Sequence, residues 1–274
     1  MTTIQILWLA ILQGLTEFLP VSSSGHLILF SKFTSFADQG LMIDVALHIG
    51  SIVAVCIYFY KEIWNMLKGL FYGKLLPCFR YEGNYLFYRI VIATIPALFA
   101  GAILKFYGMD WLRNTKILGW TILCFGILLY FADRMSMTIK KVENLSIKDA
   151  FLIGCAQCLA LIPGTSRSGI TITMGRFLGL ERREAAKFSM LLAIPTILAA
   201  GIFEGFELYQ SGDYSNLGFT IDAVWYSFIA SLIAIYGMMW WLKKSTFLPF
   251  VIYRIVLGGY LLLDSYGYLN KFLD

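Results

Sequence analysis

Six apolar runs restrict what this chain can fold into, because each is close to the length that a helix needs to cross a bilayer, about 20 residues. Hydrophobic residues make up 59% of the chain and charged residues 14%. A soluble domain carries about 25% charge. We therefore predict an all-α, polytopic integral membrane protein and exclude a soluble enzyme. The runs cover residues 41–60, 86–105, 117–132, 188–206, 223–242 and 247–265.

Two further apolar segments, residues 4–36 and 150–178, are interrupted in the middle by Pro, Gly and a cluster of hydroxyl residues. Within them, ILQGLTEFLPVSSSGH and CAQCLALIPGTSRSGI share a Gln, an apolar stretch, a Pro, a small polar loop and a Gly in the same order. LHIGSIVAV and LAIPTILAA follow at nearly the same offset. This similarity predicts an internal duplication within a single membrane domain, residues 1–274, with repeat A over 1–133 and repeat B over 145–274.

Each repeat holds one interrupted segment followed by three candidate spans, and an odd number of spans starts the second repeat on the opposite side of the membrane. The repeat is therefore predicted to be inverted. The basic residues agree, since sixteen of the 22 Lys and Arg lie in four loops and five lie on the other side. By the positive-inside rule the four loops are cytoplasmic, both termini are outside, and the interrupted segments are re-entrant helical hairpins from opposite faces. The four loops are residues 61–89, 134–148, 176–187 and 243–254, with Arg254 counted in the last.

The two interrupted loops are expected to meet in the protein interior. Non-helical backbone at membrane depth is stable only there or beside water, because unpaired N–H and C=O groups facing lipid are costly. Arg167 is the most informative residue, since a permanently charged guanidinium among hydroxyls and glycines suits phosphate oxygens. Helices predicted to start near His26 and Ile170 would add the positive ends of two helix dipoles. The residues expected to bind phosphate with Arg167 are Ser22, Ser24, Gly25, Gly164, Thr165, Ser166, Ser168 and Thr171.

Glu17, Ser23 and His26 are the other candidates for chemistry. Glu17 follows Gln13 by four residues, so both side chains share one helix face. A carboxylate beside a phosphate either holds a bridging divalent cation or accepts a proton from a nucleophile, and the alternative is a structural ion pair with Arg167. His26 could be a general base, a general acid, a nucleophile or a satisfied interior side chain. Ser23 could be a nucleophile or part of a phosphate cradle.

The motifs QGLTEFLPVSSSGH and PGTSRSGIT resemble the two signatures, (E/Q)xxxE and PGxSRSxxT, of the undecaprenyl-diphosphatase family of bacitracin-resistance type. The resemblance implies hydrolysis of undecaprenyl diphosphate to undecaprenyl phosphate and inorganic phosphate. This reaction recycles a lipid carrier for cell-wall synthesis at the bacterial inner membrane, with the site facing the periplasm. The resemblance also implies a divalent cation, Mg²⁺ or Ca²⁺, bound through Glu17 and Gln13. The functional residues that it carries over are Glu17, Ser23, His26, Ser166 and Arg167, supported by Gln13, Ser24 and Thr171. Because position 13 is Gln, the first motif supplies one carboxylate rather than two.

Two other classes of function remain open. One is a polyprenyl-phosphate carrier or flippase, since inverted repeats with broken helices also build transporters. The other is a redox protein using Cys155 and Cys158, although a lone CxxC in an apolar segment is usually a pair of small hydrophobic residues. The expected partners are the polyprenyl diphosphate and membrane lipid, and a homodimer is left open. No nucleic-acid partner is expected, since the basic residues behind the net charge of +5 fall where lipid headgroups would lie.

Overall fold

The computed structural model describes residues 2–34, 40–72, 82–107, 112, 114–135, 140–212 and 217–268. In these segments the regular structure is helical apart from one isolated bridge between Lys140 and Leu180, which confirms the predicted all-α class. Outside them lie residues 35 and 36 of the first interrupted segment, residues 73–81 and 136–139 of two predicted basic loops, and the last six residues of repeat B. The helices are α1 (Thr3–Phe18), α2 (Ser23–Phe33), α3 (Leu41–Tyr58), α4 (Tyr60–Tyr72), α5 (Glu82–Tyr107), α6 (Thr115–Met135), α7 (Ile147–Gln157), α8 (Arg167–Phe177), α9 (Arg182–Ser211), α10 (Thr220–Trp241) and α11 (Leu248–Ser265), with short 3₁₀ turns at Val142–Asn144, Cys158–Leu161 and Leu217–Phe219.

Six helices in the described part of the chain are long and apolar enough to cross a membrane: α3, α5, α6, α9, α10 and α11. They coincide with the six apolar runs of the sequence, and the chain is therefore a multi-pass membrane protein. The helix α9 is the longest, with 30 residues, and starts at Arg182 rather than at the predicted residue 188. Its first turn is charged and extends the apolar run toward the basic loop.

The two interrupted segments form pairs of short helices, α1 with α2 and α7 with α8. Each of these helices has 11 to 16 residues, fewer than the roughly 20 that a spanning helix takes. Pro20 and Pro163 explain the breaks, because proline lacks an N–H and forces the residue before it out of the helical region. Leu19 and Ile162 accordingly have extended ψ angles of 144° and 120°.

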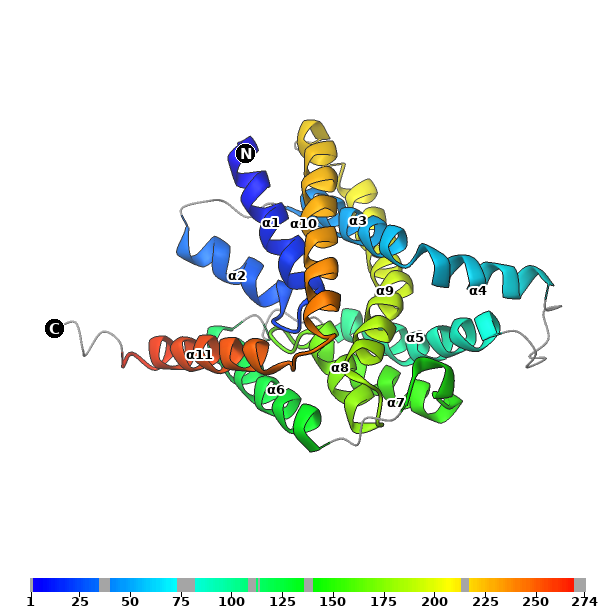
Figure 1. Ribbon diagram of the computed structural model, residues 1–274. Helices are drawn as coiled ribbons and strands as arrows, with labels where there is room; N and C mark the ends of the chain where they lie inside the picture. The colour runs from blue at the N-terminus through cyan, green and yellow to red at the C-terminus, as the bar shows by residue number, and fades with distance from the viewer. Residues whose placement is uncertain are drawn as a thin grey trace.

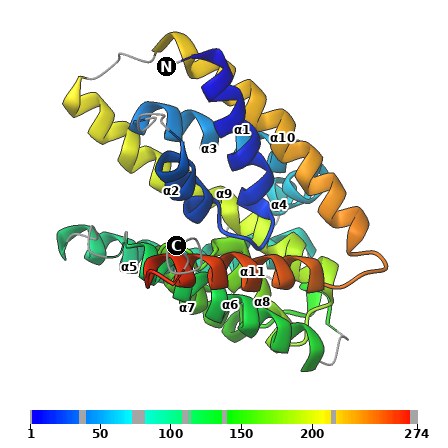
Figure 2. The same ribbon diagram turned by 90° about the vertical axis from the view of Figure 1, so that its left-hand side faces the viewer.

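The helices form two layers, which Figure 2 shows most clearly. One layer contains α1, α2, α3 and α10, and the other contains α5, α6, α7, α8 and α11 (Figures 1 and 2). Within the layers, α1 and α3 pack on α10, α7 packs on α5, and α6 packs on α11. The helix α9 packs on α3 of the first layer and on α5 and α8 of the second, so it joins them.

Small residues allow α1 to lie close to α10. Because Glu17 lies in α1, this packing fixes the position of Glu17. A Cβ added at Gly14 would lie 2.6 Å from Cβ of Ala230 and 2.8 Å from the backbone nitrogen of Ser231. On the neighbouring face of α10, Ser227 donates to the carbonyl of Leu47 at 2.7 Å. Close backbone approach and interhelical hydroxyl bonds are typical of helix pairs in membranes.

Three arginines that the sequence analysis counted as loop charges are buried in the helical body. Arg89 lies in α5, Arg176 in α8 and Arg254 in α11, with exposed fractions of 7%, 0% and 0%. Arg176 and Arg182 both pair with Asp133, at 3.2 and 2.7 Å. The count for the four basic loops therefore falls from sixteen to thirteen against five, so the charge bias persists but is smaller than predicted.

Candidate active site

The breaks of the two interrupted segments meet at the boundary between the layers. The hydroxyl of Ser168 donates to the carbonyl of Leu19 at 2.9 Å, and Ser168 is 1% exposed. Arg254 joins the same two loops, since one of its terminal nitrogens donates to the carbonyls of both Pro20 and Thr165. The loops therefore meet inside the protein, as predicted.

Ser22 and Ser166 occupy equivalent, strained positions at the start of α2 and α8. They are the two non-glycine residues with positive φ in the described part of the chain, at 78° and 72°. Each hydroxyl caps its helix by accepting from a glycine N–H, Ser22 from Gly25 at 3.3 Å and Ser166 from Gly169 at 3.1 Å. A positive φ is costly for a residue with a Cβ, and such strain is concentrated at functional sites.

These caps place the two helix starts three residues earlier than predicted. The helix α2 begins at Ser23 rather than near His26, and α8 begins at Arg167 rather than near Ile170. The reason is that the serine hydroxyls replace the missing backbone acceptors at the first turn. Arg167 is consequently the first residue of α8, where its guanidinium and the positive end of the helix dipole lie together.

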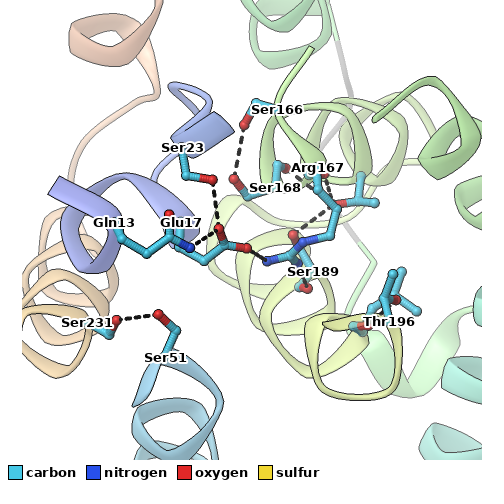
Figure 3. A network of polar contacts seen from close by, with 12 residues as sticks. Gln13, Glu17, Ser23, Ser51, Ser166, Arg167, Ser168, Ser189, Thr196 and Ser231 are labelled. Carbon is cyan, nitrogen blue, oxygen red and sulfur yellow. Dashed lines mark hydrogen bonds and ion pairs between the residues drawn. The ribbon is translucent and has the colours of Figure 1, made fainter. Parts of the chain in front are cut away.

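Glu17 lies at the centre of the site and is contacted from three elements (Figure 3). Its Oε2 accepts from Nε2 of Gln13 at 3.0 Å and from the hydroxyl of Ser23 at 2.7 Å. Its Oε1 accepts from Nη2 of Arg167 at 3.0 Å. Gln13 and Glu17 therefore share one helix face, as expected. Ser23 and Arg167 are both bonded to the carboxylate of Glu17.

The guanidinium of Arg167 is held by α9 as well as by Glu17. Its Nη1 donates to the carbonyl of Ser189 at 2.9 Å (Figure 3). The hydroxyls of Ser189 and Thr171 are 2.7 Å apart. The hydroxyl of Thr171 donates to the carbonyl of Arg167 in the same helix, and Thr171 is 1% exposed. Thr171 therefore lies on the interior side of Arg167. These bonds use two of the five N–H donors of the guanidinium.

His26 lies one turn into α2 and is 9% exposed. Its Nδ1 is 2.6 Å from the carbonyl oxygen of Ser22, and its Nε2 is hydrogen-bonded to the hydroxyl of Tyr253 in α11. A carbonyl only accepts, so Nδ1 carries a proton and Nε2 of the neutral ring accepts from Tyr253. The histidine is thus directed toward α11 rather than toward Ser23.

The remaining predicted phosphate ligands lie along the two loops. The hydroxyls of Ser22 and Ser24 are 3.4 Å apart, and those of Ser166 and Ser168 are 3.2 Å apart. Thr165 is fully buried, and its hydroxyl has no hydrogen-bond partner among the described residues. Gly164, with φ of 90°, leaves no room for a side chain, because an added Cβ would lie 2.2 Å from the hydroxyl of Thr121.

Arg254 is the main residue of the site that the sequence analysis missed. All five of its N–H donors point at backbone carbonyls: Nε at Ile122, Nη1 at Pro20 and Thr165, and Nη2 at Thr121 and Gly164, over distances of 3.0 to 3.3 Å. In the described part of the chain it forms no ion pair, so its charge adds to the positive potential of the junction. The sequence did indicate Arg254, because an ionisable residue inside an apolar run is a candidate functional residue by default.

Comparison with known proteins identifies the family. A family model described as bacitracin resistance protein BacA matches residues 6–260. The chain belongs to this family. Proteins named undecaprenyl-diphosphatase are similar over nearly the whole chain. The one from Roseobacter denitrificans is 45% identical over 271 residues, 97% of this chain and 100% of the relative, and the one from Hahella chejuensis is 44% identical over 266 residues, 97% and 99%. The resemblance stated from the two motifs is confirmed.

This BacA-family site contains one carboxylate, that of Glu17, that could bind a divalent cation. No group of three or more His, Cys, Asp and Glu side chains gathers among the described residues, so an all-protein cage is not formed there. Gln13 nevertheless buries an Oε1 atom that has no hydrogen-bond partner in the described part, next to the carboxylate of Glu17. Mg²⁺ commonly binds through one or two carboxylates plus substrate phosphates and water. The donor set fits a cation shared with a phosphate ligand.

Cys155 and Cys158 are free thiols, and the hydroxyl-lined junction does not include them. Cys158, at the start of the 3₁₀ turn that follows α7, donates to the carbonyl of Gly154 in α7 at 3.5 Å. We therefore expect Cys158→Ser to change the rate of phosphate release less than twofold, which a phosphate assay of the purified variant would measure. Loss of activity in that variant would instead support the redox alternative.

Proposed function

We propose that the chain is an undecaprenyl-diphosphatase that releases inorganic phosphate from undecaprenyl diphosphate. The family and the names of its relatives support the reaction and the substrate. In this role the protein returns a lipid carrier to cell-wall synthesis as the monophosphate. Such a substrate carries an apolar chain and a multiply charged headgroup, so its site must combine lipid access with a concentration of positive charge.

The observation that carries the proposal is the charge balance at the junction. Glu17 is already paired with Arg167, and the charge of Arg254 is surrounded by carbonyls rather than by carboxylates. The first turns of α2 and α8 add two positive dipole ends. An anion is therefore strongly favoured between the two loops, and its oxygens can bond to the free N–H donors of Arg167 and of the helix starts.

Ser23 and Glu17 have the geometry of a nucleophile and its base. The hydroxyl of Ser23 donates to Oε2 of Glu17 at 2.7 Å, within reach for proton transfer. As the proton moves to Glu17, Oγ bonds to the terminal phosphorus and the bond from that phosphorus to the bridging oxygen breaks, which frees undecaprenyl phosphate. Water then hydrolyses the phosphoserine. The same arrangement serves a water molecule that Ser23 orients and Glu17 deprotonates.

His26 and Arg167 complete the proposed division of roles. Arg167 holds the terminal phosphate and neutralises charge that develops in the transition state. Because Nε2 of His26 is bonded to Tyr253 rather than to Ser23, we assign His26 to the leaving phosphate and not to the nucleophile. The hydroxyls of Ser24 and Ser166 would supply the rest of the phosphate cradle.

A divalent cation, Mg²⁺ or Ca²⁺, is part of the proposal. Glu17 and Oε1 of Gln13 would hold it, together with oxygens of the diphosphate. When bound, it supplies neutralisation of charge on the transferred phosphate and the leaving group. The protein residues still orient the phosphate through Arg167 and receive the proton from Ser23.

We also propose that the two halves are inverted repeats and that the two broken segments are re-entrant hairpins. The strained caps Ser22 and Ser166 support this, because they are 144 residues apart and accept from glycines at the same spacing. The packing of α1 on α10 also corresponds to that of α7 on α5. The loop charges support cytoplasmic basic loops and external termini. The proposal that the site opens to the periplasm of the inner membrane rests on the family resemblance of the two motifs.

The proposal predicts turnover by the protein alone. We expect the protein, purified in detergent with Mg²⁺, to release inorganic phosphate from undecaprenyl diphosphate over many cycles without a membrane gradient. A colorimetric phosphate assay measures this directly. Stoichiometric binding of the lipid without phosphate release would favour the carrier or flippase instead, because the anion cradle would serve that function as well.

A further inference from the structure

Arg89 is a buried charge that has no polar partner in the described part of the chain. It lies in α5 and is 7% exposed. The other two buried arginines have partners, since Arg176 pairs with Asp133 and Arg254 donates to backbone carbonyls. Nε and Nη1 of Arg89 are buried without a hydrogen-bond partner among the described residues. A buried guanidinium in this state is costly, so it indicates a ligand that completes the site.

The carboxylates that attract Arg89 electrostatically are already occupied. They belong to Glu143 and Asp149, and neither forms an ion pair with Arg89. Glu143 pairs with Lys187 at 3.9 Å. Asp149 pairs with Lys140 at 3.4 Å and also caps the first turn of α7. An added anion is therefore the group that would neutralise Arg89.

One edge of the Arg89 guanidinium is open to such an anion. The ring of Tyr85, one turn earlier in α5, has its centroid 4.9 Å from the guanidinium carbon, and a ring face accepts none of the in-plane N–H groups. The remaining nitrogen, Nη2, is neither buried in the same way nor hydrogen-bonded to a described residue, so it forms the exposed edge. Phosphate oxygens at this edge would bond to Nη1 and Nη2 in fork geometry.

Arg89 lies close to one end of a membrane span. The apolar part of α5 runs from Asn84 to Leu104, and Arg89 is about five residues, or about 8 Å, from its start. The proposed topology places this end of α5 on the cytoplasmic side. An arginine side chain is long enough to reach back from this depth to the headgroups. Basic sites beside spanning helices on the cytoplasmic side are typical binding sites for anionic headgroups.

The helix α4 packs beside this end of α5 and has the pattern of a helix at a membrane surface (Figure 1). Its outer face exposes Tyr60, Trp64 and Leu67. Lys61 lies 5.8 Å from the ring centroid of Tyr60, and Lys68 lies 5.5 Å from that of Trp64. An exposed apolar face flanked by lysines is typical of interfacial helices, and the lysines attract anionic lipids.

We propose that Arg89 binds the phosphate group of an anionic phospholipid of the cytoplasmic leaflet, where α5 packs against α4 and α7. The phosphate supplies the acceptors that the guanidinium lacks, and its charge neutralises the buried cation. The acyl chains stay in the bilayer, along the exposed apolar side chains of Val91 and Ile95. A free phosphate ion offers the same oxygens, but the apolar outer faces of α4 and α5 favour a lipid. This lipid is distinct from the substrate, because its site is not at the junction of the two broken loops.

Arg89→Met and Arg134→Met form a matched pair of variants. Arg134 also lies over the ring of a tyrosine four residues earlier, Tyr130, at 5.7 Å, but it is exposed. In detergent, phosphatidylglycerol at about 100 times its Kd should raise the thermal midpoint of the unmodified protein by about 5 °C or more. Arg134→Met should show the same rise, and Arg89→Met should show none. An equal rise in all three proteins would overturn the proposed site.

The stability of Arg89→Met without anionic lipid is a second test. The substitution removes a buried charge that no described residue neutralises, so we expect the variant to fold. In micelles with phosphatidylcholine alone, its thermal midpoint should equal or exceed that of the unmodified protein. A lower midpoint would show that groups of the protein already neutralise Arg89, and it would contradict the lipid site.

Two further measurements identify the ligand and need no hydrolysis, so they do not depend on the proposed function. Native mass spectrometry with equal amounts of phosphatidylglycerol and phosphatidylcholine should show phosphatidylglycerol held by the unmodified protein and by Arg134→Met, but not by Arg89→Met. Equal retention of the two lipids would contradict an anion site. Inorganic phosphate should give no stabilisation that depends on Arg89. Stabilisation by inorganic phosphate that Arg89→Met abolishes would show a site for a free anion and overturn the lipid.

Discussion

Arg167→Ala should lower kcat/KM for undecaprenyl diphosphate by at least about 10²-fold to 10³-fold, the loss seen when one preorganised transition-state donor is removed. The reason is that Arg167 combines a full charge with unused N–H donors at the start of α8, next to the hydroxyl that Glu17 activates. Arg167→Lys should recover little activity, because an ammonium group cannot bond to Glu17, Ser189 and a phosphate in the same fork geometry. Initial rates of phosphate release over a range of substrate concentrations would measure both effects.

The same variant decides between a catalytic Arg167 and a purely structural ion pair with Glu17. The two side chains are 12% and 7% exposed, and breaking a buried pair costs about 3–5 kcal/mol of stability. Arg182→Ala is the control for a charge pair away from the two loops, since Arg182 pairs with the buried carboxylate of Asp133, which keeps Arg176 as its other partner. If Arg167→Ala lost stability while each folded molecule kept the original turnover, the structural alternative would be correct. Loss of turnover that Arg182→Ala does not share would support the proposed role.

Much of the fold could be predicted because hydrophobic length is a local property of the sequence. The six spanning helices follow from runs of apolar residues, and the two breaks follow from Pro20 and Pro163. The helix starts were predicted three residues too late, because the capping of a helix by Ser22 or Ser166 depends on a strained φ that no pattern of residue types specifies. The two-layer packing joined by α9 was likewise not predicted, since it depends on which helix faces meet.

The site was predictable where its members are neighbours in the sequence. Gln13, Glu17 and Ser23 lie within eleven residues, and Arg167 is singled out by its polar surroundings. Tyr253 was not found because an aromatic residue in an apolar helix resembles its neighbours, and only the contact with His26, 227 residues away, distinguishes it. Ser189 was missed for a related reason, since its backbone carbonyl binds Arg167 and carbonyls carry no sequence signal.

Arg254 was assigned to a loop because the charge count treated each basic residue as a mark of topology. In the structure it is fully buried in α11, and it binds carbonyls from both broken loops. The two loops begin in different halves of the chain and have few apolar side chains of their own. A single guanidinium can join them because its donors radiate in one plane and reach several acceptors at once.

Arg254→Met should therefore disrupt the junction itself. Methionine is apolar and similar in length to arginine, but it leaves the carbonyls of Pro20, Gly164 and Thr165 without these donors. Each buried acceptor that loses its partner costs about 1–3 kcal/mol, so we expect a loss of about 3 kcal/mol or more.

The expected consequence is a lower thermal midpoint in detergent together with phosphate release below one hundredth of the original rate, because the helix starts that bind the phosphate would no longer be held together. Arg254→Lys should be intermediate, since an ammonium group has three donors for the five carbonyls. A methionine variant with the original thermal midpoint and turnover would show that the loops meet without Arg254. Loss of turnover at an unchanged midpoint would show instead that its charge acts on the bound phosphate through the field alone, since all five of its donors already point at the backbone.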